Sequence, residues 1–311
     1  MEYRRVGASG LRVSSISIGG WLTFGGSVDD DATSAILGAA VDGGINFIDL
    51  ADVYARGESE RAAGKALARF RRDDLVISSK LFWPMSEAPN DRGLSRKHIH
   101  TSIDRTLRNL GTDYLDIYFC HREDPETPLE ETARAMDDLI RRGKILYWGT
   151  SMWKPRTLRD AHALASRHGW CGPQVEQPKY NLLDRSIEKK LAPTAAGLSM
   201  GLVVWSPLAG GILTGKYAGG VPAQSRGATT EWLKDVLTPQ NIARVGELAK
   251  LAQSMSLEPG QLALAWVLRR PEVSSAITGA TQVEHVQKNL RAASVQIPAD
   301  VLARLEKLFP G

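Results

Sequence analysis

The stretch DATSAILGAAVDGGINFIDLADVY, residues 31–54, contains the unit on which the prediction of the fold depends. Its first part, Asp31–Asp42, has the apolar spacing of an amphipathic helix, and the glycines at 43 and 44 end that helix. A short apolar strand, Asn46–Leu50, comes next, and polar residues stand at its carboxyl end. A helix that leads directly into a buried strand is typical of α/β proteins.

The same alternation of short β-branched or aromatic runs with longer helical patterns continues along the chain. Eight strands are predicted, at Ser15–Gly19, Asn46–Leu50, Leu75–Lys80, Leu115–His121, Ile145–Ser151, Gln174–Tyr180, Gly201–Pro207 and Ser274–Gly279. Helices are predicted between and after them, at Asp31–Asp42, Ser59–Phe70, Ser95–Asn109, Leu129–Arg141, Pro155–Arg167, Asp184–Ala196, Gln261–Arg270 and Val283–Ala292. Because parallel neighbours need long crossovers, this order predicts a parallel sheet closed into a (β/α)8 TIM barrel.

Several segments lie outside this repeat. Residues Tyr3–Ile16 contain the turn-like letters GASG and predict a β-hairpin that plugs the bottom of the barrel. Two additional helices are predicted at Pro239–Ser254 and Pro298–Leu308. The stretch Lys216–Thr230, rich in Gly, Pro and Ser, comes after the seventh strand, and we interpret it as a functional loop, with a disordered loop as the alternative. No linker or charge block divides the chain, which predicts a single domain over residues 1–311.

The composition narrows the class of protein. Hydrophobic residues make up 43% and charged residues 24% of the chain, as in a globular protein with a large core. The formal net charge is +4, but Lys and Arg are scattered among 35 acidic residues, so we expect no nucleic-acid-binding face. Two isolated cysteines predict a reducing compartment. The chain shows no signal region and no apolar run of about 20 residues, so we expect a soluble cytoplasmic protein with no membrane segment. A homo-oligomer is left open.

Two local motifs suggest other functions, and the residues around them argue against both. Residues 210–217, GGILTGKY, nearly match the phosphate-binding loop of nucleoside triphosphatases, but Tyr217 occupies the position of the magnesium-binding hydroxyl. The AGGVP after it cannot begin a helix, which that loop requires. His98 and His100 have the chemistry of metal ligands, but alternate positions on a helix point apart and no third ligand is evident. We therefore expect no metal.

Polar side chains stand repeatedly at the carboxyl ends of the predicted strands. Asp49 and Tyr54 lie at and after the end of the second strand, Lys80 ends the third and His121 ends the fourth. In a barrel these ends converge on one mouth. A tyrosine with its ordinary pKa of about 10 is a weak acid at neutral pH, and a neighbouring cation lowers that pKa. We interpret Tyr54 as a proton donor to a carbonyl, Asp49 as the partner of Lys80, and His121 as a substrate ligand. Ordinary strand-end residues, or a buried Asp–Lys pair, are the alternative.

These segments resemble a known family. Ile48–Tyr54 with Gly57 and Glu60, Lys80, and the pair His121-Arg122 resemble the aldo-keto reductases, whose tetrad pairs an Asp, a Tyr five residues on, a Lys and a His. The stretches Trp148–Trp153, Trp205–Gly211 and Gly215–Tyr217 resemble the branch that holds the voltage-gated potassium channel β subunits and their bacterial relatives. The similarity runs from the N-terminal hairpin to Asn289.

The resemblance implies NADPH as the cofactor. A Rossmann fingerprint is absent, because no two glycines of the chain stand two positions apart, so the loops after strands seven and eight are the expected phosphate site. By resemblance, Ser151 and Gln177 hold the carboxamide and Trp205 stacks on the nicotinamide. The full set of implied cofactor residues is Gly20, Trp21, Asp49, Ser151, Met152, Gln177, Trp205, Ser206, Pro207, Leu208, Ala209, Gly210, Gly211, Lys216, Arg226, Gly279, Thr281, His285, Lys288 and Asn289.

Some of these positions depart from the family pattern. Met152 stands where an Asn is common, which removes one expected hydrogen bond to the carboxamide. His285 and Lys288 stand where Gln and Glu are more frequent, which affects the adenine and ribose contacts. Arg226 and Thr281 are expected at the 2′-phosphate that distinguishes NADPH from NADH.

The function implied is an oxidoreductase, an NADPH-dependent carbonyl reductase that transfers hydride to an aldehyde or ketone. Aromatic and catalytic side chains expected at the substrate are Trp21, Tyr54, Phe82, Trp83, His121 and Trp153. The rival is a regulatory subunit that holds NADPH and docks to a channel or other partner. His121 argues against the rival, because channel-associated relatives tend to carry Asn there, and so does a start directly at the hairpin. A cofactor-free barrel enzyme is the third alternative.

Overall fold

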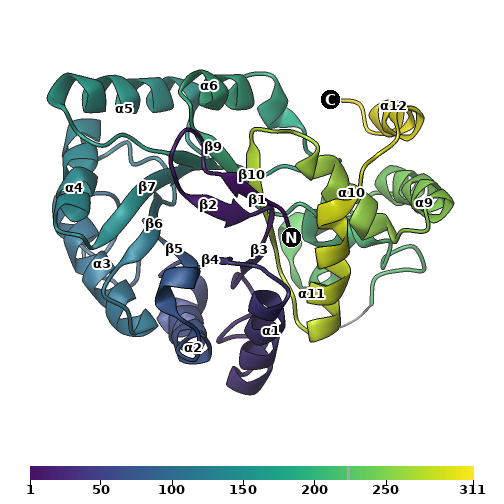
Figure 1. The fold of residues 1–311 in the computed structure, drawn as a ribbon, viewed down its shortest axis with the longest axis horizontal. Helices are drawn as coiled ribbons and strands as arrows, with labels where there is room; N and C mark the ends of the chain where they lie inside the picture. Colours follow the sequence, from purple (N-terminus) through teal and green to yellow (C-terminus); the bar gives the residue numbers. More distant parts are fainter. Residues whose placement is uncertain (223–224) are drawn as a thin grey trace.

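The computed structural model describes residues 1–222 and 225–311, without the side chains of Arg226, Thr229 and Trp232. Eight parallel strands close into a barrel in the order β10-β3-β4-β5-β6-β7-β8-β9, with the helices outside it (Figure 1). The barrel strands are β3(Ile16–Gly19), β4(Phe47–Asp49), β5(Val76–Leu81), β6(Leu115–Cys120), β7(Ile145–Ser151), β8(Val175–Gln177), β9(Gly201–Val204) and β10(Val273–Thr278). The predicted (β/α)8 TIM barrel is confirmed.

The helices of the repeat have the predicted order around the barrel. They are α1(Asp30–Asp42), α2(Glu58–Leu67), α3(Arg96–Leu110), α4(Leu129–Arg141), α5(Pro155–His168), α6(Leu191–Gly197), α10(Pro259–Leu268) and α11(Val283–Leu290). Short 3-10 turns are η1(Tyr54–Gly57), η2(Arg72–Asp74), η3(Ser186–Glu188), η4(Ala209–Thr214) and η5(Arg291–Ser294). Among these, α3 shows why the boundaries fall where they do. The Ser95 hydroxyl accepts a hydrogen bond from the His98 amide at its start, and Gly111, with φ of 65°, ends it in the left-handed conformation.

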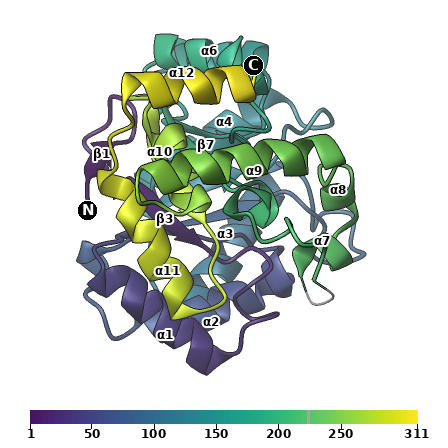
Figure 2. The same ribbon diagram turned by 90° about the vertical axis from the view of Figure 1, so that its right-hand side faces the viewer.

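The two additional helices are confirmed as α9(Pro239–Ser254) and α12(Ala299–Leu308). Figure 2 shows α9 crossing one side of the molecule, packed against α10 and α12. Two short helices, α7(Arg226–Thr229) and α8(Glu231–Lys234), fall in and just after the stretch expected to be a loop, and they lie beside one end of α9. No helix within residues 1–222 and 225–311 combines the length and the apolar character that crossing a bilayer requires.

The strands β8 and β9 are shorter than predicted, for backbone reasons. Pro178 comes directly after β8 and has no N–H to continue the ladder. Beyond β9, Ser206 has φ of 55°, which takes the chain out of extended conformation. The regular pairing therefore ends earlier there, with one further parallel bridge between Lys179 and Trp205, and residues 205–208 become part of the wall of the barrel mouth.

The N-terminal hairpin closes the bottom of the barrel, as predicted. It consists of β1(Tyr3–Arg5) and β2(Arg12–Ser14), which pair antiparallel and lie over the centre of the barrel in Figure 1. Val6 and Val13 are fully buried and join one apolar cluster with strand residues from inside the barrel, among them Phe47, Ile117 and Val203. Burying one such side chain contributes about 1.5–3 kcal/mol. Apolar side chains thus fill the barrel at this end, and only the opposite end, where the carboxyl ends of the strands lie, can form an open site.

Candidate active site

The structure brings together the four polar residues expected at the strand ends. Asp49 ends β4, Lys80 lies in β5, Tyr54 begins the turn η1, and His121 comes directly after β6. The Lys80 ammonium donates to Asp49 Oδ2 at 2.7 Å and to the Leu50 carbonyl at 2.6 Å. It also lies 3.2 Å from the Tyr54 hydroxyl. The Lys80 side chain has no solvent exposure, so this contact is made in a dry environment.

A strained turn after β4 places Tyr54 beside the Lys80 ammonium. The chain leaves β4 and makes a tight turn in which the Tyr54 amide donates to the Ala51 carbonyl at 3.1 Å. The next two residues, Ala55 and Arg56, have φ of 46° and 54° although neither is glycine. Left-handed non-glycine residues cost on the order of 1–3 kcal/mol each and concentrate at functional sites. The amide of Asp52 donates to the Lys80 carbonyl at 3.1 Å, which ties the turn to β5.

Asp49 is held from both sides. Its Oδ1 accepts from the Ser78 hydroxyl at 2.8 Å and from the Gln177 side-chain amide at 3.0 Å, while Oδ2 takes the ammonium. The Ser151 hydroxyl in turn donates to the Gln177 carbonyl at 2.9 Å. Two residues expected at the cofactor carboxamide are therefore connected by hydrogen bonds to the Asp–Lys pair.

Burial and charge act against each other on the phenol. Burial raises the pKa of Tyr54 above its ordinary value, and the Lys80 ammonium lowers it without cancelling that effect. For Lys80, burial alone would lower the pKa, but the charge of Asp49 and the contact with Tyr54 outweigh it and the pKa is raised. The expected depression of the Tyr54 pKa by Lys80 is thus present as an effect, but burial makes the net shift upward.

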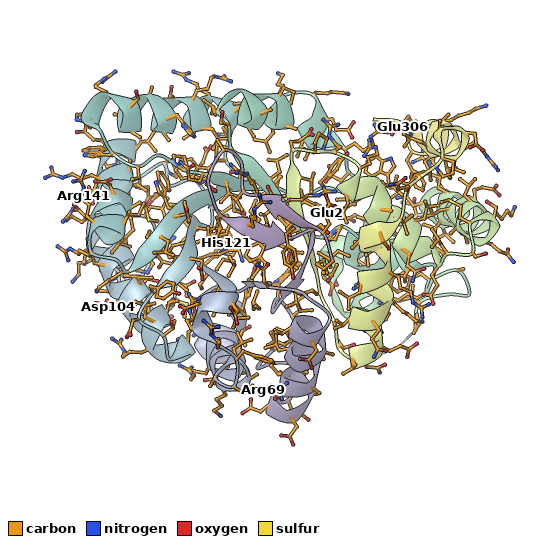
Figure 3. The ribbon with its side chains drawn as sticks, viewed as in Figure 1. Glu2, Arg69, Asp104, His121, Arg141 and Glu306 are labelled. Atoms are coloured by element: carbon orange, nitrogen blue, oxygen red, sulfur yellow. The ribbon has the colours of Figure 1, made fainter. Side chains whose placement is uncertain are left out.

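The surroundings of His121 favour the neutral form of its imidazole. Burial and the charges of Lys80 and Arg122 hold its pKa well below the ordinary value for histidine. Its ring lies edge-on to that of Tyr54, with centroids 6.0 Å apart. Among the described residues, its Nδ1 has no hydrogen-bond partner. Figure 3 shows His121 inside the ring of strands, whereas Arg69, Asp104, Arg141 and Glu306 lie at the periphery.

A cavity of about 1130 Å³ opens over this cluster. That volume exceeds the range of about 300–1,000 Å³ for drug-sized ligands, so the cavity has room for a ligand longer than those. It is lined by most of the residues expected at cofactor or substrate, namely Gly20, Trp21, Asp49, Tyr54, Trp83, His121, Ser151, Gln177, Trp205, Ser206, Pro207, Leu208, Gly210, Gly211, Lys216, Gly279, Thr281, His285, Lys288 and Asn289.

Four expected residues are not among those that line the cavity. Met152 is 43% exposed and has a positive φ of 59°. Ala209 is buried. Trp153 is buried in the apolar core around the barrel, and Phe82 packs against the ring of Trp83. The side chain of Arg226 lies outside the described residues.

Glycines form a close cradle at one end of the cavity. Gly210 and Gly211 have φ of 67° and 95°, and a Cβ on Gly211 would lie 2.8 Å from the Lys216 ammonium. The Gly211 amide is bonded to the Leu208 carbonyl, so the features that fit a pyrophosphate here are the close approach that two glycines allow and the neighbouring Lys216 cation. The cavity is thus divided into a phosphate-type end and an end at Tyr54.

Lys288 lies on the same side of the cavity but is not a free cation. Its ammonium is 3.1 Å from Glu258 and 3.1 Å from Glu284. Much of its positive charge is therefore already balanced by these two carboxylates.

Some cavity residues were not expected from the sequence. Leu22, Thr23 and Phe24 come directly after Trp21, and their proximity to it in the chain was the available signal. Glu258 and Gln261 come from the start of α10, where no strand end marks them. Only the packing of α10 against the barrel brings them to the cavity. Arg122 stands beside His121 in one of the family-like motifs, but the sequence pointed to no role for it.

Comparison with known proteins agrees with the geometry. The family model described as "Aldo/keto reductase family" matches residues 15–309. A protein of Oryza sativa subsp. japonica named "Probable voltage-gated potassium channel subunit beta" is 44% identical over 302 residues, which cover 95% of this chain and 92% of that relative. A protein of Arabidopsis thaliana with the same name is 42% identical, with the same coverage of both chains. A putative voltage-gated potassium channel subunit beta of Schizosaccharomyces pombe is 39% identical, over 99% of this chain and 93% of that relative.

The matched region contains all eight strands of the barrel and all four residues of the Asp49–Tyr54–Lys80–His121 cluster. The family it identifies supports an oxidoreductase role. The resemblance seen in the sequence is confirmed: this chain belongs to the aldo/keto reductase family.

Proposed function

We propose that this protein is an NADPH-dependent carbonyl reductase of aldehydes or ketones, with Tyr54 as the proton donor. The observation that carries the proposal is the buried Lys80 ammonium, which contacts Asp49 at 2.7 Å and the Tyr54 hydroxyl at 3.2 Å. The ammonium favours release of the phenolic proton to a substrate oxygen, against the opposing effect of burial, because the cation stabilises the phenolate that remains.

The residues present fit the cofactor. Ser206, Gly210, Gly211 and Lys216 would hold the pyrophosphate, and Trp205, Ser151 and Gln177 would hold the nicotinamide. Bound NADPH would supply the hydride to the carbonyl carbon. Arg226 and Thr281 are proposed at the 2′-phosphate, on the basis of the family resemblance.

Side chains of the protein would transfer the proton to the substrate oxygen. Tyr54 donates it to the carbonyl oxygen, Lys80 stabilises the phenolate, and Asp49 keeps Lys80 charged and aimed at the hydroxyl. His121, neutral because of burial, can donate one N–H hydrogen bond to the same oxygen and orient the carbonyl. Trp21 and Trp83 give the cavity an apolar wall that suits the body of a small aldehyde or ketone.

The same proposal covers location and organisation. Cys120 and Cys171 are both free thiols, one buried and one exposed, as expected in a reducing cytoplasm. We propose that the chain works there as one domain.

A second candidate is a regulatory subunit that holds NADPH and docks to a partner protein. The names of the relatives from Oryza sativa subsp. japonica and Arabidopsis thaliana, channel β subunits, favour it. Under this alternative the protein would bind NADPH without consuming it in the presence of carbonyl compounds.

A substrate panel decides between the two. Purified protein is mixed with NADPH and a series of aldehydes and ketones, and cofactor consumption is followed by near-ultraviolet absorbance. Tyr54→Phe keeps the ring but removes the proton, so turnover should fall by about 10²–10⁴-fold with little change in NADPH affinity. Tyr147→Phe is the matched control, because Tyr147 is a half-buried phenol that does not line the cavity. Tight NADPH binding without turnover of any compound would favour the regulatory subunit, and a Tyr54→Phe variant with wild-type turnover would remove Tyr54 as the donor.

A further inference from the structure

The guanidinium of Arg122 lies at the Tyr54 end of the cavity and has no carboxylate partner among the described residues. It is half-buried and lines the cavity directly after His121. Its Nη1 donates to the His121 carbonyl and lies 3.4 Å from the Ser151 hydroxyl. None of the described residues accepts a hydrogen bond from its Nε or Nη2. Most of the donors of this guanidinium are therefore available to a ligand.

The other cations around the cavity are accounted for. Lys288 lies between two carboxylates, and Lys216 lies against the glycine cradle. By contrast, no described carboxylate comes within 4.0 Å of the Arg122 guanidinium. The buried acid on its side, Glu176, is already bonded to the Thr150 hydroxyl and to the Trp153 amide.

Arg122 lies at the Tyr54 end of the cavity. Its guanidinium carbon lies 5.6 Å from the centroid of the Trp83 ring, and Trp83 lies 6.2 Å from His121, centroid to centroid. His121 is in turn 6.0 Å from Tyr54. A carbonyl compound whose oxygen sits between Tyr54 and His121 and whose body lies along Trp83 would bring its far end towards the Arg122 guanidinium. That end would lie beside the Ser151 hydroxyl, which is proposed for the cofactor carboxamide.

The chemistry of this end indicates what that far end is. Removing a guanidinium from water is unfavourable unless an anion pairs with it, and burial lowers the pKa of Arg122 here. A carboxylate or phosphate matches the planar fork of arginine with two parallel hydrogen bonds. We propose that Arg122 selects carbonyl substrates that carry an anionic oxygen group, a carboxylate or a phosphate, at the end away from the reacting carbonyl. This inference rests on the proposed carbonyl reductase function.

The test compares matched charged and neutral substrates. One pair is 4-oxobutanoate and its methyl ester, and the second is glycolaldehyde phosphate and glycolaldehyde, so the two arms separate carboxylate from phosphate. The readout is the ratio of kcat/KM for the charged and the neutral member. General effects of a substitution on Tyr54 or His121 act on both members and cancel in this ratio.

Wild type should prefer the charged member of at least one pair. Arg122→Gln should lower that ratio by about 10- to 100-fold, which is about 1.4–2.8 kcal/mol at about 1.4 kcal/mol per decade. Arg122→Lys should restore part of the preference, because it returns the charge without the fork. Lys154→Gln is the control. Lys154 comes shortly after β7, its side chain is 80% exposed, and its ammonium is 3.7 Å from Glu123. Its loss should leave the ratio unchanged.

Several results would overturn the inference. A ratio that Arg122→Gln leaves unchanged would do so, and a matching loss of NADPH affinity would assign Arg122 to the cofactor instead. Thermal melting of each variant shows whether it is folded. If wild type reduces the neutral members in a Tyr54-dependent way but has no preference for charge, only the inference fails. If no member of either pair is reduced while other carbonyl compounds of the substrate panel are, again only the inference fails. If no carbonyl compound is reduced at all, the proposed function itself fails.

Discussion

Replacing Lys80 with methionine removes the buried ammonium and keeps an unbranched side chain of similar length. The ammonium contacts Asp49 at 2.7 Å, the Leu50 carbonyl at 2.6 Å and the Tyr54 hydroxyl at 3.2 Å. With an effective dielectric constant of about 20, a charge pair separated by the 3.2 Å of the Tyr54 contact interacts by about 5 kcal/mol. The negative charge of Asp49 repels the phenolate and offsets part of this attraction, so the net stabilisation of the phenolate by the Asp49–Lys80 pair is smaller but still substantial.

The loss of that charge should show in the pH profile. Burial already raises the pKa of Tyr54, and Lys80 is the main group that lowers it. Without Lys80 the phenol is a weaker acid, so turnover at neutral pH should fall by about 10²–10⁴-fold. The inflection where activity is lost as pH rises should move to higher pH, because the phenol keeps its proton longer.

Stability has to be separated from chemistry in this variant. Lys80→Met leaves Asp49 Oδ2 without its charge partner in a buried wall, and breaking a buried pair costs about 3–5 kcal/mol. The double variant Asp49→Asn with Lys80→Met removes both charges and should recover much of the lost free energy of unfolding. It should not recover turnover.

The assay is steady-state kinetics across neutral and alkaline pH, with urea denaturation of the same preparations. If the double variant regains turnover together with stability, Lys80 acts only by holding the structure. If the inflection of Lys80→Met stays in place while only the KM rises, Lys80 is a binding residue. Either result would refute the role of Lys80 in tuning the acidity of Tyr54.

Two further predictions concern the cofactor and the buried acids. Arg226→Ala should weaken NADPH binding by about 10- to 100-fold and leave NADH binding nearly unaffected, since one charge-assisted hydrogen bond contributes about 1.5–3 kcal/mol. Quenching of tryptophan fluorescence by each cofactor measures the two affinities. Equal losses of affinity for both cofactors would contradict the prediction. Burial and the charge of Glu60 raise the pKa of Asp52 to about 7, so its stabilising protonated form is lost as pH rises towards that value. From pH ~5 to pH ~8, wild type should lose on the order of 2 kcal/mol more unfolding free energy than Asp52→Asn in urea titrations, and parallel curves would count against it.

The sequence predicted the repeat because its signals are local. Ile145–Ser151 was predicted as a strand with the bounds that the structure gives β7, and the helix predicted over Ser95–Asn109 is α3, with Ser95 as its N-cap. The hairpin plug was likewise predicted from local turn residues. Parallel strands in a closed barrel must present their carboxyl ends at one mouth, so the convergence of Asp49, Lys80 and His121 could be predicted from strand order.

Other features depended on backbone torsions that the letters do not reveal. Met152 is exposed and Ala209 is buried, and both have a positive φ although neither is glycine. The short helices α7 and α8 lie in and beside a Gly- and Pro-rich stretch, where composition favoured an irregular loop. In each case the three-dimensional surroundings outweighed the local preference of the chain.

By itself, then, the sequence determined the eight-strand order, the closed end of the barrel and the residue types at the open end. Periodicity, turn residues and the parallel crossover rule act over short distances along the chain, and that is why they can be read from it. Only the tertiary structure decided that burial outweighs Lys80 in the pKa of Tyr54, that Lys288 is neutralised by Glu258 and Glu284, and that Arg122 lies beside no described carboxylate. Burial and charge pairing depend on distances between segments far apart in the chain, which exist only once the barrel has closed.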